Sequence, residues 1–425
     1  MINDVGITVR RLCGLIDNWN AGGLRDGGFC GGLIVDPALP VIVLSQKMFT
    51  SMDSFSLMAV PFFMLAGTLM EKSGITKILV NWAKSLVGHT TGGIGDAAIV
   101  SGVVMAGVSG SANADTSALA SMLVPMMREE KYDVGYACAL VASCGALGPI
   151  IPPSIMMVLY SGVTNIPINK LFLAGYIPGL LIAVGYMLVN YMYAKRNNIS
   201  KTKFAGFKVL GQNTIYAAPA VVMPCIIIFG IMLGVVTATE AGVLACTYSI
   251  IYGIIKKTLN VKVLKDCLMD AVHATVNCMI IVAFAGIFGT LATNYNMSKV
   301  ILSLTSAFVS HKVIIMLFIS VVLFIAGMFI DSNAAMLMLI PVFSPLILQY
   351  NFDPIYFAMV CILTLDMGGM SPPVGLLMYI ASSITDTPLS KTVKQIWKFL
   401  LVNYGVTILV IFVPALVTLL PSLFG

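Results

Sequence analysis

Apolar runs of about 20 residues recur along this chain, and short polar segments separate them. Each run is long enough to cross a hydrocarbon core of roughly 30 Å as a helix. Residues 71–89 differ, because they are amphipathic and favour a helix that lies along the membrane surface. Apolar helical segments are predicted over residues 55–70, 92–125, 133–161, 171–194, 215–234, 241–255, 273–292, 313–345, 355–383 and 399–420.

Four of the apolar runs contain residues that end helices. Residues 107–116 interrupt the run that starts at residue 92. Two half-length helices that meet at a polar tip, a re-entrant hairpin, fit this pattern better than one continuous span. A second hairpin is predicted over residues 313–345. Residues 145–153 and 368–373 interrupt two further runs, which are therefore predicted to be broken membrane helices.

The start of the chain fits the membrane pattern less well. Residues 1–32 are rich in glycine and charged side chains, so they cannot form a spanning helix, and they lack the apolar core of a signal peptide. Residues 33–49 are apolar but are broken by Asp36, Pro37 and Pro40. We therefore expect a first membrane segment to be weak or missing.

The interruptions recur at a constant distance. A shift of 220 aligns residues 106–153 with residues 326–373, with eleven identities and no gap. Most of the shared residues are Gly, Asn, Asp or Pro, which an apolar-rich alphabet does not readily match by chance. Two copies of one unit are therefore predicted. The identities pair Ala106, Gly107, Asn113, Ala114, Leu119, Pro125, Asp133, Tyr136, Gly148, Pro152 and Pro153 with Ala326, Gly327, Asn333, Ala334, Leu339, Pro345, Asp353, Tyr356, Gly368, Pro372 and Pro373.

Composition supports a membrane protein and excludes several other classes. The chain is 59% hydrophobic and 10% charged, against roughly 25% charged residues in soluble domains. The net charge of +6 does not indicate nucleic-acid binding, because the basic residues cluster beside apolar spans, where they report topology. The nine cysteines are scattered without a C-x-x-C pair, so neither a disulfide framework nor a transition-metal site is expected.

The basic segments predict which ends of the helices are cytoplasmic. If residues 195–208 are cytoplasmic, the lysines after later crossings fall on the same side, as the positive-inside rule requires. The first hairpin closes on a charged segment at residues 128–131, whereas the second closes on residues 349–354, which have no Lys or Arg. The two copies are therefore predicted to be inverted. Inverted repeats with interrupted helices are typical of secondary transporters, whose substrate and ion site lies near the bilayer midplane.

Candidate site residues occupy the four interruptions. Backbone carbonyls freed at broken helix ends can replace the water around Na⁺, and helix N-termini can face an anion. Small residues also let membrane helices pack closely, but the matching positions of the breaks favour a site. The candidates are Gly107, Ser109, Gly110, Ser111, Asn113 and Thr116 in the first tip, Gly327, Asp331, Ser332 and Asn333 in the second, and Gly145, Gly148, Pro149, Pro152, Pro153, Gly368, Gly369, Pro372 and Pro373 in the broken helices.

Four acidic residues need separate interpretations. Asp115, Asp331 and Asp366 lie inside apolar runs, where a charge is costly enough that a function is expected. The structural alternative for each is a helix cap or a bond to a buried hydroxyl. Glu240 follows Thr237 in a capping-box pattern, so a structural role is predicted for it.

One enzymatic alternative comes from Gly107-Val-Ser-Gly110, a G-x-S-G string of the kind that intramembrane serine proteases use around a nucleophile. His273 is the only candidate partner for Ser109. The corresponding string in the second tip, Gly327-Met-Phe-Ile330, has no serine. A hairpin role is therefore favoured, and the chain is predicted not to be an enzyme.

Several of these motifs, taken in order, resemble a known family from about residue 40 to the end. They resemble the large membrane subunit of tripartite ATP-independent periplasmic (TRAP) transporters. The motifs are Phe62-Phe-Met-Leu-Ala-Gly67, Gly107-Val-Ser-Gly-Ser-Ala-Asn-Ala-Asp115, Gly148-Pro-Ile-Ile-Pro-Pro-Ser154, Leu171-Phe-Leu-Ala-Gly175, Thr237-Ala-Thr-Glu-Ala241, Gly327-Met-Phe-Ile-Asp331 and Ser371-Pro-Pro-Val-Gly375.

The resemblance implies a sodium-coupled importer of organic acids, such as C4-dicarboxylates or sialic acids, in the bacterial inner membrane. It implies an elevator-type fold, in which a transport domain with both hairpins slides against a scaffold. The implied partners are a small four-helix membrane subunit and a periplasmic substrate-binding protein. Na⁺ is the implied coupling ion, with no other cofactor, and Ser371 joins the candidate site. A stand-alone ion-coupled carboxylate transporter of related architecture is the alternative.

Two features depart from the family. Residues 1–32 do not resemble the apolar first helix that family members usually have. Asp366 and Ser371 stand where family members often have Asn and Thr, so one sodium site is expected to differ in charge or proton coupling.

The predicted fold class is an all-α polytopic membrane protein with inverted repeats, two re-entrant hairpins and two broken helices. The expected divisions are an atypical N-terminal segment (1–32), N-terminal scaffold helices (33–70), a first repeat (71–170), connecting scaffold helices (171–270), a second repeat (271–390) and a C-terminal helix (391–425).

Overall fold

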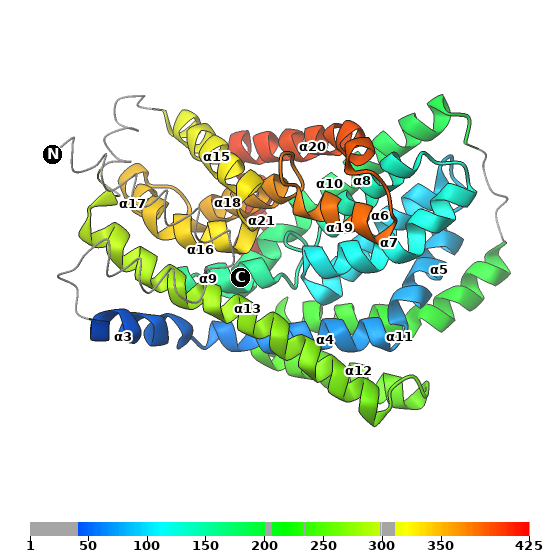
Figure 1. The fold of residues 1–425 in the computed structure, drawn as a ribbon, viewed down its shortest axis with the longest axis horizontal. Helices are drawn as coiled ribbons and strands as arrows, with labels where there is room; N and C mark the ends of the chain where they lie inside the picture. Colours follow the sequence, from blue (N-terminus) through cyan, green and yellow to red (C-terminus); the bar gives the residue numbers. More distant parts are fainter. Residues whose placement is uncertain (1–40, 200–205, 233, 298, 300–310, 425) are drawn as a thin grey trace.

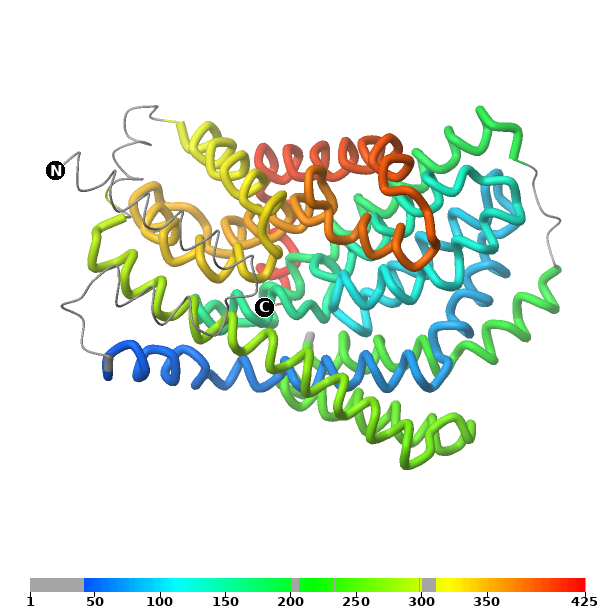
Figure 2. Tube along the Cα trace, viewed as in Figure 1, coloured from blue at the N-terminus to red at the C-terminus, as the bar shows by residue number. Residues whose placement is uncertain are grey.

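The described part of the protein is built of helices. The computed structural model describes residues 41–199, 206–232, 234–297, 299 and 311–424, and this part contains no β-strand (Figures 1 and 2). By length and composition, six of its helices could cross a membrane, or seven if one bent pair counts as a span. The six are α10 (Ile168–Arg196), α11 (Phe207–Met232), α12 (Ala238–Ile255), α13 (Val261–Asn294), α15 (Lys312–Phe329) and α20 (Leu389–Phe412).

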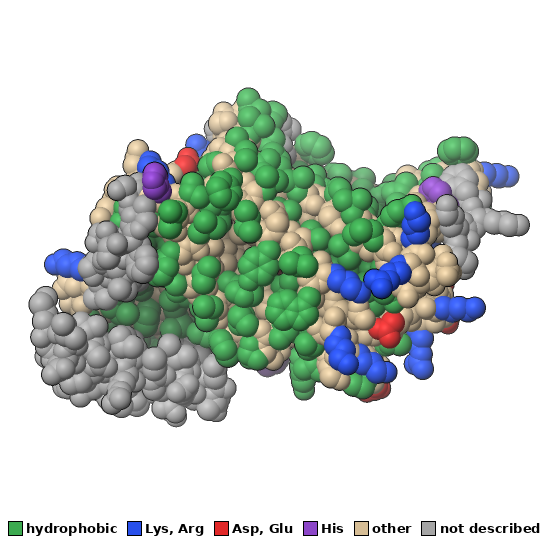
Figure 3. All heavy atoms as spheres, turned by 90° about the horizontal axis from the view of Figure 1, so that it is seen from above, with side chains coloured by type: hydrophobic (Ala, Val, Ile, Leu, Met, Phe, Trp, Pro, Cys, Tyr) green, Lys and Arg blue, Asp and Glu red, His purple; other side chains and the backbone are tan. Residues whose placement is uncertain are grey.

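The surface of the molecule fits a bilayer. Figure 3 shows hydrophobic side chains over the middle of one face, while Lys and Arg side chains gather toward one end. Large apolar side chains are exposed on several long helices, including Phe229 on α11 (57% exposed) and Leu401 on α20 (70%). Exposed residues of this kind face lipid tails at little cost. A multi-pass membrane protein, as predicted, is confirmed in this coarse form.

The N-terminal helices begin with the bent pair. α3 (Val41–Met52) is followed by a short 3₁₀ turn, η1 (Ser56–Met58), and by α4 (Ala59–Lys72), and the two arms meet at 66°. α4 packs against α12 and α13. α5 (Ile75–Val87) occupies the segment predicted to be amphipathic. The expectation for residues 1–32, and most of that for residues 33–49, lies outside the described residues.

The first predicted hairpin is present as α6 (Gly93–Ser109) and α7 (Ala112–Glu129), which pack against each other. We call this pair hairpin 1, and its tip is Gly110 and Ser111. Gly110 has φ +60°, and a Cβ there would collide with the carbonyl oxygen of Pro153. Glycine is therefore required both by the turn and by the close approach of the chain that faces it.

The second predicted hairpin is present as α15 and α16 (Ser332–Phe343), followed by the short helix α17 (Pro345–Tyr350). We call α15 and α16 hairpin 2, and its tip is Ile330 and Asp331. In Figure 1, the α6–α7 pair lies toward the end of the molecule that holds α5, and hairpin 2 reaches toward α17 at the opposite end. The two tips approach each other near the middle.

The two predicted broken helices are also present. The first consists of α8 (Val134–Gly145) and α9 (Ile155–Thr164), and the second of α18 (Pro354–Gly369) and α19 (Leu376–Ile384). Both Pro-Pro bonds in the breaks are cis. The carboxylate of Asp133 accepts a hydrogen bond from the backbone N–H of Tyr136 at 3.0 Å, and that of Asp353 accepts one from Tyr356 at 2.9 Å. Aspartates 220 residues apart therefore cap α8 and α18 at matched N–H groups, and Asp353 accepts a second bond from the N–H of Ile355 at 2.8 Å.

Several predicted helix boundaries are wrong. α11 begins at Phe207 rather than at residue 215. α13 begins at Val261 rather than near residue 273, because the side chain of Asn260 caps the backbone N–H of Val263 and the helix continues through charged residues. The last helix was predicted over residues 399–420. The chain instead forms α20 from Leu389 and α21 (Ala415–Phe424), and the two are separated at Pro414, which cannot continue a helix. Apolar content alone marks the lipid-facing part of a helix, not its ends.

The capping box predicted at α12 is confirmed. The Glu240 carboxylate accepts from the backbone N–H of Thr237 at 2.7 Å, and the Thr237 hydroxyl accepts from the N–H of Glu240 at 3.3 Å. Glu240 thus has the structural role expected of it.

Candidate functional site

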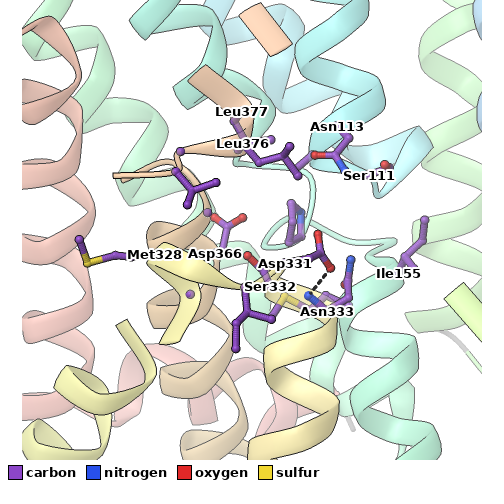
Figure 4. A pocket seen from close by; sticks show the side chains of 18 of the residues that line it. Ser111, Asn113, Ile155, Met328, Asp331, Ser332, Asn333, Asp366, Leu376 and Leu377 are labelled. Atoms are coloured by element: carbon purple, nitrogen blue, oxygen red, sulfur yellow. Dashed lines mark hydrogen bonds between the residues drawn. The ribbon is translucent and has the colours of Figure 1, made fainter. Parts of the chain in front are cut away.

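The two hairpin tips and the two helix breaks border one cavity of about 210 Å³, which we call the central pocket. Figure 4 shows Ser111 and Asn113 of hairpin 1 above Asp331, Ser332 and Asn333 of hairpin 2. Both tips are also tied to the breaks. The backbone N–H of Ile155 donates to the carbonyl of Gly110 at 3.3 Å, and the Ser332 hydroxyl donates to the carbonyl of Leu365 at 3.0 Å.

Four helices begin at the central pocket. Its lining includes Ala112 and Asn113 of α7, Ile155 and Met156 of α9, Ser332 and Asn333 of α16, and Leu376 and Leu377 of α19. Helix N-termini carry partial positive charge and free N–H groups. No Lys, Arg or His side chain lines the pocket within the described ranges. Positive potential in this pocket therefore comes from backbone.

The four N-termini are capped differently. Ser154 caps α9, where its hydroxyl accepts from the N–H of Met157 at 3.2 Å, and Asp331 caps α16, where its carboxylate accepts from Asn333 at 3.0 Å and Ala334 at 3.3 Å. The N-cap residues of α7 and α19 are Ser111 and Gly375, and neither helix has a side-chain cap. The N-termini of α7 and α19 are thus the ones left open to a ligand.

Asp331 and Asp366 both line the central pocket. Asp331 is a helix cap, as the structural alternative proposed, and it also faces the cavity. Asp366 is 2% exposed, and its Oδ2 is buried with no hydrogen-bond partner. A buried carboxylate without a partner is costly. Capping of α16 gives Asp331 a structural role, whereas no hydrogen bond gives Asp366 one.

Two predicted site residues lie in a separate, smaller cavity of about 30 Å³, between hairpin 1 and the end of α4. There the Ser109 hydroxyl donates to Oδ1 of Asp115 at 2.6 Å, and Glu71 lines the opposite wall. Asp115 is fully buried, and its Oδ2 has no partner. Asp115 therefore does not share the central pocket with Asp331 and Asp366.

Thr116 also lies outside the central pocket, and its buried hydroxyl has no partner. A Cβ added at Gly145 would overlap the Oγ1 of Thr116, and one added at Gly148 would lie 3.1 Å from the Oδ2 of Asp115. Both unpartnered oxygens of hairpin 1 thus lie against the break between α8 and α9.

The remaining predicted residues divide into two groups. Four of them line the central pocket: Gly110, Pro149, Gly327 and Gly369. The others are absent from its described lining: Gly107, Pro152, Pro153, Gly368, Ser371, Pro372 and Pro373. Gly368 has a packing role, because a Cβ there would lie 2.6 Å from the Cα of Gly327. The Ser371 hydroxyl donates to the carbonyl of Met367 at 2.9 Å, within its own chain turn.

Sequence reasoning missed two features. Gly375, with φ +56°, begins α19 at the pocket, and a glycine two residues after the Pro-Pro pair was the available signal. Asp96 forms a buried network at the base of hairpin 1, where its carboxylate accepts from Asn190 Nδ2 at 2.7 Å and from Thr90 Oγ1 at 2.5 Å. A single acidic residue in the apolar start of α6 was the signal for that network.

The geometry does not support the protease alternative. The Ser109 hydroxyl donates to Asp115, and the His273 side chain is exposed on α13. A nucleophilic serine needs a base within hydrogen-bond reach, and the hydrogen bond of Ser109 goes to a carboxylate instead.

The sequence matches known transport proteins over most of its length. Residues 28–416 match the family described as Tripartite ATP-independent periplasmic transporter, DctM component. The 2,3-diketo-L-gulonate TRAP transporter large permease protein YiaN of Escherichia coli (strain K12) is 34% identical over 380 residues, which cover 89% of each chain. The sialic acid TRAP transporter large permease protein SiaM of Vibrio cholerae serotype O1 (strain ATCC 39315 / El Tor Inaba N16961) is 33% identical over 393 residues, 92% of each chain.

The fold matches a solved transporter structure. The YdaH transporter of Alcanivorax borkumensis superposes with a TM-score of 0.64 over 87% of this chain and 88% of that one, at 12% sequence identity. This likeness concerns the fold alone, because the identity is too low to carry a function.

Proposed function

Since the chain belongs to the DctM family of large TRAP transporter permease proteins, we propose that it is the membrane subunit of a sodium-coupled importer of organic acid anions. Its relatives are named as transporter permeases, so the chain is a transport protein and not an enzyme. The relatives' substrates, 2,3-diketo-L-gulonate and sialic acid, suggest a carboxylate as the cargo.

The single observation that carries this proposal is the convergence of four helix N-termini on a pocket without a basic side chain in its described lining. The open N-termini of α7 and α19 can hold a carboxylate, because N–H groups and the helix dipole both favour negative charge there. Helix N-termini carry only partial positive charge, so they attract an anion less strongly than a full Lys or Arg charge at the same place would. The organic anion bound at these N-termini is the proposed cargo that the protein carries across the membrane.

Sodium is proposed to bind where carboxyl and hydroxyl oxygens remain unpaired. Asp115 Oδ2 and Thr116 Oγ1 are buried without partners against the break between α8 and α9. Hard cations prefer oxygen ligands, and backbone carbonyls at broken helices supply the rest of such a shell. A cation there would offset the cost of the buried Asp115 carboxylate. Asn113 and Asn333 lie at matched places in the two tips and line the central pocket, where they are proposed to link substrate binding to cation binding.

The transport cycle is proposed to be of the elevator type, built on two inverted copies. Support comes from the hairpins, whose bases lie toward opposite ends of the molecule in Figure 1, and from the aspartate N-caps at the matched positions Asp133 and Asp353. The end where Lys and Arg gather in Figure 3 is proposed to face the cytoplasm of a bacterial inner membrane. Both hairpins and both broken helices would then move together against a scaffold that includes α4, α11 and α12.

Two partners complete the proposed importer. Large permeases of this family work with a small membrane subunit and a periplasmic binding protein. We expect the small subunit to have four helices and the binding protein to deliver the organic acid from the periplasm. The exposed apolar side chains of α11 and α12, such as Phe229 and Ile251, are available to the small subunit and to lipid.

The test is uptake of radiolabelled organic acids into proteoliposomes that contain the chain and both partners. Replacement of the inward Na⁺ gradient by K⁺ should abolish uptake, and Asn113→Ala or Asn333→Ala should raise the Na⁺ concentration needed for half-maximal uptake. Uptake that is indifferent to Na⁺ would contradict the sodium assignment. Full uptake without either partner would instead indicate the stand-alone carboxylate transporter.

A further inference from the structure

The small cavity of about 30 Å³ lies between two parts of the molecule that the proposed cycle moves past each other. Hairpin 1 forms one wall with Ser109 and Asp115, and α4 and α5 form the other with Gly67, Glu71 and Thr76. The contact between the walls is loose, because a Cβ at Gly67 would lie 3.6 Å from Ser109, an ordinary packing distance. The cavity therefore exists only while hairpin 1 lies beside the end of α4.

Asp115 forms the inner end of the cavity. It is fully buried, and its Oδ1 accepts a hydrogen bond from the Ser109 hydroxyl at 2.6 Å. Its Oδ2 has no partner and lies near Gly148, in the break between α8 and α9 where sodium is proposed to bind. Asp115 is thus the residue that the proposed sodium site and the small cavity share.

Glu71 forms the outer end of the cavity. It lies in the last turn of α4, and its side chain is exposed. This end of α4 lies beside the start of α13, where the Thr68 hydroxyl donates to the carbonyl of Cys267 at 3.4 Å. The first turns of α13 carry Lys262 and Lys265, so the proposed orientation places Glu71 on the cytoplasmic side.

The chemistry of the cavity favours a small cation. No Lys, Arg or His side chain belongs to its described lining, whereas two carboxyl groups and the hydroxyls of Ser109 and Thr76 do. Oxygen atoms of these kinds are the ligands that hard cations prefer. The volume has room for about two water molecules, which is too little for an organic acid. The cavity can therefore pass a cation and not the proposed cargo.

We propose that this cavity is the cytoplasmic exit of the coupling cation, and that Glu71 attracts the cation from Asp115 toward the cytoplasm. The inference rests on the proposed sodium-coupled function and adds its release step. Both α4 and hairpin 1 are needed to form the exit, so it opens only when hairpin 1 lies at the cytoplasmic end of α4. The cation then leaves on one side of the membrane, and the cargo in the central pocket leaves by a separate route.

The first test follows a cation into the cavity from the cytoplasmic side. In a chain without the nine native cysteines, Ala118→Cys places a thiol in the cavity lining, and Ala120→Cys places one that is also buried on α7 but outside the lining. Ag⁺ is a small monovalent cation that binds thiolates. Ag⁺ applied to inside-out vesicles that contain both membrane subunits should protect position 118, and not position 120, from later maleimide labelling of the denatured protein.

The second test removes the charge at the outer end. Glu71→Gln keeps the size of the side chain, and in proteoliposomes with both partners it should lower the maximal uptake rate about tenfold at low ionic strength. The Na⁺ concentration needed for half-maximal uptake should not rise, because the site at Asp115 is intact. Choline chloride should reduce the loss, since salt screens an exposed charge. Glu129→Gln, at the exposed end of hairpin 1 and outside the cavity, is the control and should have no effect.

Three results would overturn the exit path while leaving the transport function intact. They are a thiol at position 118 that Ag⁺ does not protect, equal protection at position 120, and an unchanged maximal rate for Glu71→Gln. A higher Na⁺ requirement in Glu71→Gln would also contradict the path, because it would make Glu71 a sodium ligand. Sodium-indifferent uptake by the unaltered chain would instead defeat the proposed function itself.

Discussion

Hairpins 1 and 2 share one design and differ at the residue that begins the second helix of each. Ser111 and Asp331 are 220 positions apart, and both are N-caps. The serine leaves α7 without a side-chain cap, whereas the aspartate caps α16 with two hydrogen bonds. A single difference at a matched place leaves the helix N-terminus uncapped in one tip and places a carboxylate on it in the other.

The broken helices show the reverse arrangement. α9 is capped by Ser154, and α19 begins at Gly375 without a side-chain cap. Ala146 stands 220 positions before Asp366, so the buried carboxylate belongs to the second copy alone. The comparison teaches that the breaks determine where the central pocket lies, while the residues at the helix N-termini determine whether each part of its lining is uncapped backbone or a carboxylate.

The largest effect on stability is expected from a glycine substitution at the contact between hairpin 2 and the broken helix formed by α18 and α19. A Cβ at Gly368 would lie 2.6 Å from the Cα of Gly327, and this backbone atom cannot move away easily. Gly368→Ala should therefore lower the free energy of unfolding by about 3 kcal/mol and abolish uptake. At the matched Gly148, the nearest atoms would be 3.1 Å away, and Gly148→Ala should cost clearly less. Thermal unfolding of the assembled complex measures both.

Gly211→Ala is the control, because nothing lies within 4 Å of a Cβ there. It should leave the melting temperature unchanged or slightly raised, since alanine favours helix. Equal losses at Gly148 and Gly368 would contradict the difference between the two packing contacts.

An intermediate effect on stability is expected when polar side chains at the bases of the hairpins are removed. Asp96→Ala removes two buried hydrogen bonds to a carboxylate, those from Asn190 and Thr90, which should lower the free energy of unfolding by about 2 kcal/mol. The described contact at the base of hairpin 2 is an exposed bond from Lys312 Nζ to the carbonyl of Asn351. Lys312→Ala should therefore have almost no effect in the same unfolding experiment. A larger loss for Lys312→Ala would reverse the comparison.

The smallest effect on stability is expected when the N-cap residues of the two tips are substituted. Asp331→Ala removes two hydrogen bonds to the N-terminus of α16 and should cost about 1 kcal/mol, whereas Ser111→Ala removes no cap and should be nearly neutral. Melting temperatures of the two variants decide this. Similar losses for both would show that Ser111 caps α7 after all.

Sequence alone located the tips and breaks, because Gly, Pro and polar residues cluster at those places within otherwise apolar runs. It did not locate helix ends that depend on a cap beyond the apolar run, as at Asn260 before α13. It also grouped Asp115 with Asp331 and Asp366. Asp115 lies one turn into α7, and its carboxylate faces Ser109 in the smaller cavity and not the central pocket. Which of the two cavities it faces depends on helix rotation, which a list of polar residues cannot supply.

The opposed entry of the two hairpins is the central claim, and cysteine labelling tests it most directly. In a variant without the nine native cysteines, Glu129→Cys marks the end of hairpin 1, and Leu348→Cys marks α17 beyond hairpin 2, where the side chain is 87% exposed. A membrane-impermeant maleimide on intact spheroplasts should label position 348 at once and position 129 only after permeabilisation. Labelling of both positions from the same side would contradict the account.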